Sequence, residues 1–218
     1  MKINTSSSKE FGDKASSVII ECAEDRIEKS GKFNLAICGG RMPIPIFNSL
    51  KDKYKKANFY SDFENNPKIE DLTQAIQKLR SKDIELIIAC GGGSVIDFAK
   101  LLKVYLYDAS SILDFPGKYK NPSKSQISMI AIPTTAGTGS EATHFSVLYY
   151  NKKKYSIASD HMLPDYSILN SSICLNASLK IKSSCVIDAF SQAIESFWSV
   201  GANLESIKFA KKAIHLID

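Results

Sequence analysis

Short apolar runs alternate along most of the chain with stretches whose apolar positions recur every three or four residues. The runs have the length of buried strands, and the spacing in the other stretches is that of a helix. Strands are predicted at residues 33–38, 59–63, 84–89, 127–132, 145–150, 155–158 and 166–169. Helices are predicted at residues 18–27, 44–55, 69–80 and 94–107. Alternating strands and helices predict an α/β fold with a mostly parallel sheet that helices cover on both faces.

The pattern changes near residue 176. No strand-like run follows, and residues 179–199 carry their apolar positions on one helical stripe. A second amphipathic helix is predicted to begin near Glu205. We therefore expect an α/β domain at residues 1–175 and the first part of a helical domain at residues 176–218.

Composition and charge are ordinary for a globular protein, with 44% hydrophobic and 23% charged residues. The net charge of +5 comes from lysines that are mostly scattered, which favours solvated faces over a nucleic-acid-binding patch. No apolar run approaches the ~18 residues of a membrane span, and the polar N-terminus lacks the apolar core of a secretory signal. The five cysteines include no CxxC pair, which is typical of small buried residues in a reducing compartment. We expect a cytoplasmic protein without a nucleic-acid or membrane partner.

The segment CGGGSVIDFAK, residues 90–100, follows an apolar run and leads into a predicted helix. A strand, a glycine turn and a helix start offer backbone N–H groups and the positive end of a helix to a phosphate. Glycines at such a turn can also serve only to fit a tight bend. Gly91, Gly92, Gly93 and Ser94 are therefore candidates for phosphate binding, with a purely structural turn as the alternative.

A second polar loop, AIPTTAGTGSEAT at residues 131–143, again directly follows an apolar run. Few structural needs explain so many small, hydroxylated and glycine residues in one loop. A loop that wraps a polar cofactor would use them for close backbone approach and as hydroxyl donors.

Together the two segments closely resemble the GGGSxxDxAK and IPTTAGTGSE motifs of the iron-containing (group III) alcohol dehydrogenase family. The resemblance continues through Asn66-Pro67, KYSIAS at residues 154–159, LPDYSIL at 163–169 and DAFSQAIESFWS at 188–199. It implies a dehydroquinate synthase-like fold, in which a Rossmann-like domain is followed by a helical domain. It also implies NAD or NADP and a divalent metal ion, Fe(II) or Zn(II), as cofactors. Because only the start of a helical domain is predicted here, we interpret the chain as a partial member of the family.

The resemblance assigns cofactor contacts to residues of both loops. It implies that Gly92, Gly93 and Ser94 approach the pyrophosphate and that Asp97 faces the nicotinamide; a plain first-turn helix carboxylate is the alternative. Lys154 matches a lysine that reaches the nicotinamide ribose, but it also ends a run of three lysines typical of a surface. The remaining loop residues implied to contact the ribose and phosphates, or to lie beside them, are Thr134, Thr135, Thr138 and Ser140.

The turn after the first predicted strand bears on the choice between NAD and NADP. Many relatives carry an acidic residue there, whereas this chain has Gly39, Gly40 and Arg41. A carboxylate would repel a 2'-phosphate, while an arginine can donate to it. We therefore favour NADP, with a solvated turn residue as the alternative for Arg41.

The implied metal site is where the sequence departs from the family. The resemblance implies an Asp, a His one helical turn later and two further His in the helical domain. Asp188 fits the first position, but position 192 is Gln. Asp188 and Gln192 are the metal and catalytic candidates, although a neutral amide oxygen is a poorer ligand for such an ion than imidazole. The chain has three histidines, His144, His161 and His215, and none of them matches an implied ligand position. His144 is a candidate for lining the substrate site.

The resemblance implies a metal-assisted oxidoreductase that interconverts a small aldehyde and its primary alcohol with NAD(P)H. We also expect a homo-oligomer, a dimer. The segments THFSV at residues 143–147 and SQAIESFWS at 191–199 look like a branch that includes phosphonoacetaldehyde reductases. Two alternatives stay open. One is an NAD-dependent lyase similar to dehydroquinate synthase, and the other is a catalytically impaired nucleotide-binding fragment.

Overall fold

The computed structural model describes residues 2–5, 34–39, 58–108, 125–175 and 177–217, together with residues 17, 19, 21, 24 and 112. The chain forms two compact units. Unit 1 comprises Met1–Thr134 and Ser140–Asn170, and unit 2 comprises Thr135–Gly139 and Ser171–Asp218.

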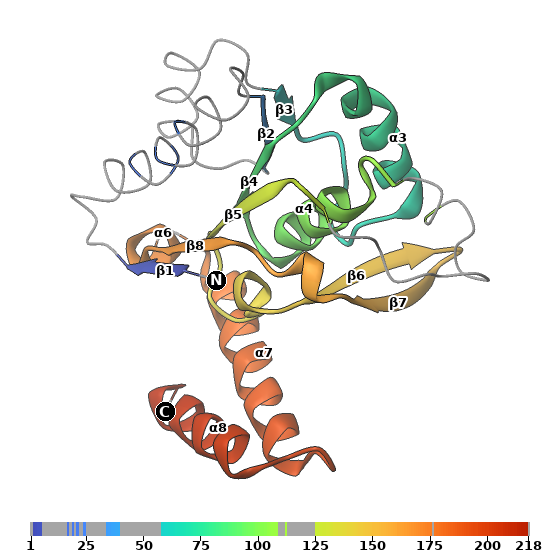
Figure 1. The fold of residues 1–218 in the computed structure, drawn as a ribbon. Helices are drawn as coiled ribbons and strands as arrows, with labels where there is room; N and C mark the ends of the chain where they lie inside the picture. The colour runs from blue at the N-terminus through green and yellow to red at the C-terminus, as the bar shows by residue number, and fades with distance from the viewer. Residues whose placement is uncertain are drawn as a thin grey trace. The chain divides into compact units, whose positions relative to one another are not determined.

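Unit 1 is built on a six-stranded sheet with the order β1-β8-β5-β4-β2-β3 (Figure 1). All of its described pairings are parallel. The α/β fold with a parallel sheet is therefore confirmed. The strands are β1 (Lys2–Thr5), β2 (Leu35–Gly39), β3 (Asn58–Tyr60), β4 (Leu86–Gly91), β5 (Ser128–Pro133) and β8 (Tyr166–Leu169).

Helices α3 (Ile69–Leu79) and α4 (Gly93–Tyr105) pack in the same unit, and α4 lies against β4 and β5. All six residues of β4 are buried, and so is nearly every residue of α4 from Val95 onward. A helix that is buried on nearly all sides belongs in a core, so α4 is a core helix of the unit. Short 3-10 turns complete it: η1 (Arg80–Lys82), η2 (Ser140–Ala142) and η3 (Asp160–Met162).

An antiparallel hairpin, β6 (Phe145–Tyr150) and β7 (Lys153–Ala158), forms a separate two-stranded sheet. Asn151 and Lys152 turn the hairpin with positive φ angles of 48° and 62°. Pairs of residues with positive φ are typical of turns whose twist matches that of the strands. The close succession of predicted strands in this region is thus explained by a hairpin.

The predicted strands at 84–89 and 127–132 are both present but begin and end later than expected. Gly91 and Pro133 still pair in the ladder, which extends both strands into the following loops. The short strand β1 was not predicted, because KINT contains one strongly apolar residue; backbone pairing with β8 defines it instead. The predicted helix at 44–55 lies outside the described residues, as does most of the helix at 18–27.

Unit 2 contains α6 (Ser171–Leu175), α7 (Leu179–Trp198) and α8 (Leu204–Ile217), with α7 packed against α8. Polar caps explain where the two long helices begin. Ser178 Oγ accepts from the Ile181 N–H at 3.4 Å, and Asn203 Oδ1 accepts from the Ser206 N–H at 2.9 Å. Within the described part of the chain, no helix is both long and apolar enough to cross a bilayer.

Candidate functional site

The glycine turn after β4 leads directly into the N-terminus of α4. Gly92 is the N-cap residue in an extended conformation (φ −76°, ψ −175°), and its carbonyl accepts from the N–H groups of Val95 and Ile96. Among the residues that the structure describes, no side chain caps this helix end. Residues 92–94 are half-exposed, so the first-turn N–H groups can be offered to an acceptor such as a phosphate oxygen. This geometry fits the phosphate of a bound nucleotide.

Gly91 has a structural reason of its own to be glycine. A Cβ built there would lie 2.4 Å from Val95 Cγ2 and 2.6 Å from Val95 Cβ. The missing side chain lets the first turn of α4 pack closely against the end of β4. Gly91 is therefore explained by packing at a tight turn alone. Gly92 and Gly93 form the half-exposed start of the helix, where a phosphate could bind.

Ser94 is hydrogen-bonded to the Asn66-Pro67 segment, which is part of the same family resemblance. Its Oγ accepts from the Asn66 N–H at 3.2 Å, and Asn66 adopts a left-handed φ of 64°. The next carbonyl, that of Pro67, accepts from the Tyr149 N–H at 2.7 Å. This short segment thereby connects the start of α4 to strand β6.

Asp97, one turn into α4, is held by two hydrogen bonds within the chain. Its Oδ1 accepts from Ser140 Oγ at 2.5 Å, and its Oδ2 accepts from the Val147 N–H at 3.0 Å. Burial raises the pKa of Asp97, and the two hydrogen bonds and the nearby charges of Lys100 and Lys154 partly offset the rise. The structure thus brings two predicted cofactor residues, Asp97 and Ser140, into contact, and the charge of a third, Lys154, acts on the pKa of Asp97.

Lys100 belongs to the same cluster and was not predicted. Its side chain is fully buried, and Nζ donates to Thr143 Oγ1 at 3.0 Å and to the Phe145 carbonyl at 2.8 Å. Burial lowers its pKa to about 8, against the opposing pull of Asp97 and Glu141. Lys100 is the last residue of the GGGSxxDxAK motif and stands between the apolar residues Ala99 and Leu101, which was the available signal.

Two further predicted residues lie at the carboxyl edge of the same sheet. The Thr134 N–H donates to the Gly91 carbonyl at 2.9 Å, which joins the ends of β4 and β5. Gly39 ends β2 in register with Cys90. Ligands of open parallel sheets bind beyond the carboxyl ends of the strands, so both positions suit a cofactor site. Arg41, the residue on which the NADP prediction rests, lies outside the described residues.

The second loop divides between the two units. Thr135 and Thr138 belong to unit 2 together with Asp188 and Gln192, whereas the other cofactor candidates belong to unit 1. A Cβ at Gly137 would lie 2.5 Å from the Cys185 carbonyl oxygen, so this loop packs directly on the backbone of α7. The structure places the loop one helical turn from Asp188.

The predicted metal residues do not make a metal site on their own. Asp188 and Gln192 are four residues apart on α7, and both are exposed. Among the described residues, no cluster of three or more His, Cys, Asp or Glu side chains could hold a metal ion. One carboxylate and one neutral amide do not fit Fe(II) or Zn(II), which bind imidazole nitrogen well. Glu195 is exposed on the same helix and completes no cluster.

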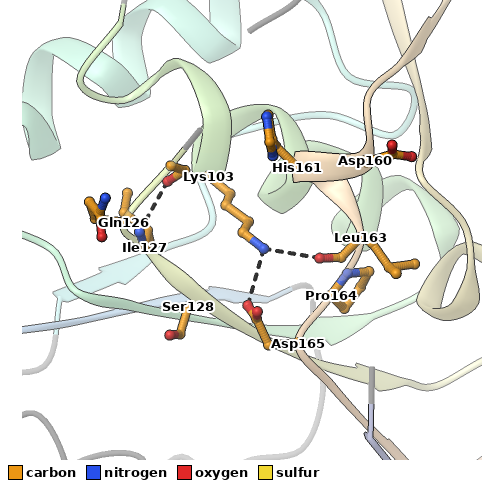
Figure 2. A pocket seen from close by; sticks show the side chains of 10 residues that line it. Lys103, Gln126, Ile127, Ser128, Asp160, His161, Leu163, Pro164 and Asp165 are labelled. Atoms are coloured by element: carbon orange, nitrogen blue, oxygen red, sulfur yellow. Dashed lines mark hydrogen bonds and ion pairs between the residues drawn. The ribbon is translucent and has the colours of Figure 1, made fainter. Parts of the chain in front are cut away.

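A pocket of about 380 Å³ lies elsewhere in unit 1, at the amino ends of β5 and β8 (Figure 2). Lys103 is its buried charge, with Nζ 3.1 Å from Asp165 Oδ2 and 3.0 Å from the Leu163 carbonyl oxygen. His161 and Asp160 also line it. None of the predicted site residues lines this pocket. It lies at the amino edge of the sheet, and the glycine turn lies at the opposite, carboxyl edge.

A dinucleotide-binding α/β protein is the class that this sheet, glycine turn and helix start define. The family model described as iron-containing alcohol dehydrogenase matches residues 18–171, more than half of the chain. The chain belongs to the iron-containing alcohol dehydrogenase family. The matched residues include every predicted cofactor residue, and they stop before Asp188 and Gln192.

Individual relatives agree with this assignment. The chain is 31% identical over 174 residues to long-chain-alcohol dehydrogenase 1 of Geobacillus thermodenitrificans, covering 79% of this chain and 44% of that protein. It is 37% identical over 153 residues to 4-hydroxybutyrate dehydrogenase of Clostridium kluyveri, covering 69% and 40%. The structure of sulfoacetaldehyde reductase from Bifidobacterium kashiwanohense in complex with NAD+ matches all of this chain and 57% of that one, with a TM-score of 0.79 and 28% identity. The chain spans less than half the length of the two curated relatives.

Proposed function

We propose that this protein serves the NAD(P)H-dependent interconversion of a small aldehyde and its primary alcohol. The observation that carries the proposal is the start of α4. A 13-residue helix begins at a half-exposed glycine turn at the carboxyl edge of a parallel sheet, and no side chain in the described part of the chain caps it. The helix end and its N–H groups provide the positive partial charge that a diphosphate requires.

Each residue near the turn has a proposed task in binding the cofactor. Gly92, Gly93 and Ser94 donate backbone N–H groups to the diphosphate, and Asn66 fixes the Ser94 side chain. Asp97, Ser140 and Lys154 lie farther along and orient the nicotinamide ribose. The bound cofactor supplies the hydride that reduces the carbonyl carbon. Thr134, Thr135 and Thr138 are proposed as further hydroxyl donors to the cofactor.

No reaction step is assigned to a metal ion, because the described donor set does not fit one. The family uses a divalent metal, so Asp188 and Gln192 remain proposed ligands that need additional groups. A nucleotide-binding protein with little catalysis is the second candidate function, and the neutral Gln192 is the observation that favours it. A lyase similar to dehydroquinate synthase is the weaker candidate, because the relatives above are named as oxidoreductases.

We further propose that the substrate is an aldehyde with an anionic end. Two relatives have names that point to such molecules, 4-hydroxybutyrate dehydrogenase and sulfoacetaldehyde reductase. The resemblance to phosphonoacetaldehyde reductases points to the same class. Steady-state rates with 4-oxobutanoate, sulfoacetaldehyde, phosphonoacetaldehyde and butanal test the proposal. A higher kcat/KM for butanal than for every anionic aldehyde would contradict it.

Nucleotide binding is tested by the fluorescence of NADH and NADPH with wild-type protein and Gly92→Val. The valine side chain blocks the approach of a phosphate to the helix start, so affinity should fall at least tenfold, or about 1.4 kcal/mol. Gly201→Ala is the control, because a Cβ there meets only Ser199 Oγ, at 3.7 Å. Equal affinity of both variants for the nucleotides would contradict the proposal that the diphosphate binds at the start of α4.

A further inference from the structure

Helix α4 carries two buried lysines three residues apart, and they bind different parts of unit 1. Lys100 is 0% exposed and Lys103 is 6% exposed. Lys103 donates to Leu163 and Asp165 at the amino edge of the sheet. Lys100 donates to Thr143, the last residue of the predicted cofactor loop, and to the carbonyl of Phe145, two residues later. The two ammonium groups are therefore similarly buried, but they donate hydrogen bonds to different segments of unit 1.

The contacts of Lys100 are placed to fix the end of that loop. Thr143 Oγ1 also contacts the Ser140 carbonyl at 3.4 Å, and Ser140 Oγ donates to Asp97. Lys100 and Asp97 thus hold the segment 140–145 to α4 at two points one helical turn apart. Both points lie beside residues to which the proposed function gives a role in cofactor binding.

We propose that Lys100 is a positioning residue for the cofactor, whose ammonium group holds the segment 140–145 in its binding conformation on α4. The inference rests on the proposed function. Lys100 is fully buried and acts through the loop, not through contact with the cofactor. Lys100 is the last residue of the GGGSxxDxAK motif, for which the resemblance implied cofactor contacts only at the glycines, Ser94 and Asp97.

The charge of Lys100 gives the role a measurable pH dependence. Its pKa is lowered to about 8, and the charged groups that face it are Asp97 on its own helix and Glu141 on η2. The charge of Lys154, on β7, acts on the neighbouring Asp97 and lowers its pKa. An anionic cofactor favours the protonated lysine, and charge-assisted hydrogen bonds are stronger than neutral ones. Cofactor affinity should therefore be highest below pH 8 and fall as the pH rises through that value.

The test compares Lys100→Met with Lys103→Met in the full-length protein. Both changes remove a buried ammonium from α4 and keep a similar volume, so the second controls for lost packing and stability. Dissociation constants for NADH and NADPH are measured by nucleotide fluorescence between pH 6.5 and 9.5, the range that brackets the lowered pKa. We expect Lys100→Met to weaken binding about tenfold at pH 7 and to abolish the pH dependence. Lys103→Met should bind as the wild type does at every pH.

Equal affinity of Lys100→Met and Lys103→Met, or a pH profile that persists in Lys100→Met, would overturn the inference. If Lys100→Met does not fold, Thr143→Val decides the question, because it removes one acceptor and keeps the side-chain shape. Weaker binding by Thr143→Val, with unchanged thermal stability, supports the role, and unchanged binding overturns it. If the wild-type protein binds neither nucleotide, the proposed function itself is wrong. That result differs from the outcomes above, in which the wild type binds and only the role of Lys100 is overturned.

Discussion

At the level of single residues, the glycine turn serves both close packing and candidate phosphate binding, and the sequence motif alone does not show which glycine serves which. Gly91 provides space for Val95, whereas Gly92 and Gly93 form the exposed start of α4. The same motif therefore contains a packing residue and two candidate binding residues. Substitutions in neighbouring positions should separate stability from affinity.

Gly91→Ala should destabilise the fold, because the new Cβ would lie 2.4 Å from Val95 Cγ2. Relief requires a shift of Val95 or of the helix, and overpacking of this kind costs about 1–3 kcal/mol. Urea unfolding measures the change, with Gly201→Ala as the control. A free energy of unfolding equal to that of the wild type would mean that the helix start adjusts freely.

Arg41 should favour NADPH over NADH. A charge-assisted contact to the 2'-phosphate is worth about 1.5–3 kcal/mol. Arg41→Ala should therefore weaken NADPH binding and leave NADH binding nearly unchanged, and Arg41→Lys should keep part of the preference. A wild-type protein that prefers NADH would show the NADP prediction to be wrong.

At the element scale, buried polar contacts tie α4 to the loops around it. The pair Lys103–Asp165 is largely buried on the lysine side, and Asp165 Oδ2 also accepts from the Met129 N–H at 2.7 Å. Asp165→Ala should destabilise the protein by about 1–3 kcal/mol, because it leaves a buried ammonium and an N–H without this acceptor. Glu64→Ala breaks the exposed pair with Lys68 and should leave stability unchanged. Equal effects of the two changes in urea unfolding would contradict this reading.

The buried Lys100 also makes stability depend on pH. Burial lowers the pKa of Lys100 from its ordinary value of 10.5 to about 8 in the fold. Between these values the unfolded chain binds more protons, so the free energy of unfolding rises with pH in this window. Wild-type protein should therefore gain stability relative to Lys100→Met from pH 8 to 10.5. Unfolding curves across that range check the sign, and a parallel pH dependence of both proteins would refute the burial effect.

At the scale of the whole molecule, the order of strands and helices could be predicted because buried strands and amphipathic helices have different periods. The strand β1 could not, since KINT has no such pattern and pairing with β8 defines it. The role of Lys100 was missed because a lysine in a helix usually faces solvent. The place of the loop residues Thr135–Gly139 beside α7 depends on Gly137 meeting Cys185, a contact between distant positions that no local pattern reveals.

The metal question also belongs to this scale. With one carboxylate and one amide in the predicted positions, Gln192→His in the full-length protein should raise Zn(II) affinity, by roughly tenfold or more. Gln192→Ala is the control and should not raise it. Elemental analysis after dialysis, with a competing chelator, measures the change. Tight stoichiometric metal in the wild type that is unaffected by either substitution would mean that the ligands lie elsewhere.

The most direct test of the central claim is nucleotide-dependent aldehyde reduction by the full-length protein, measured with Gly92→Val alongside. We expect oxidation of NADH or NADPH in proportion to the alcohol formed, and a loss of nucleotide affinity of at least tenfold in Gly92→Val with its fold retained. No nucleotide binding by the folded wild type, or wild-type affinity in Gly92→Val, would contradict the claim that α4 begins at the cofactor site.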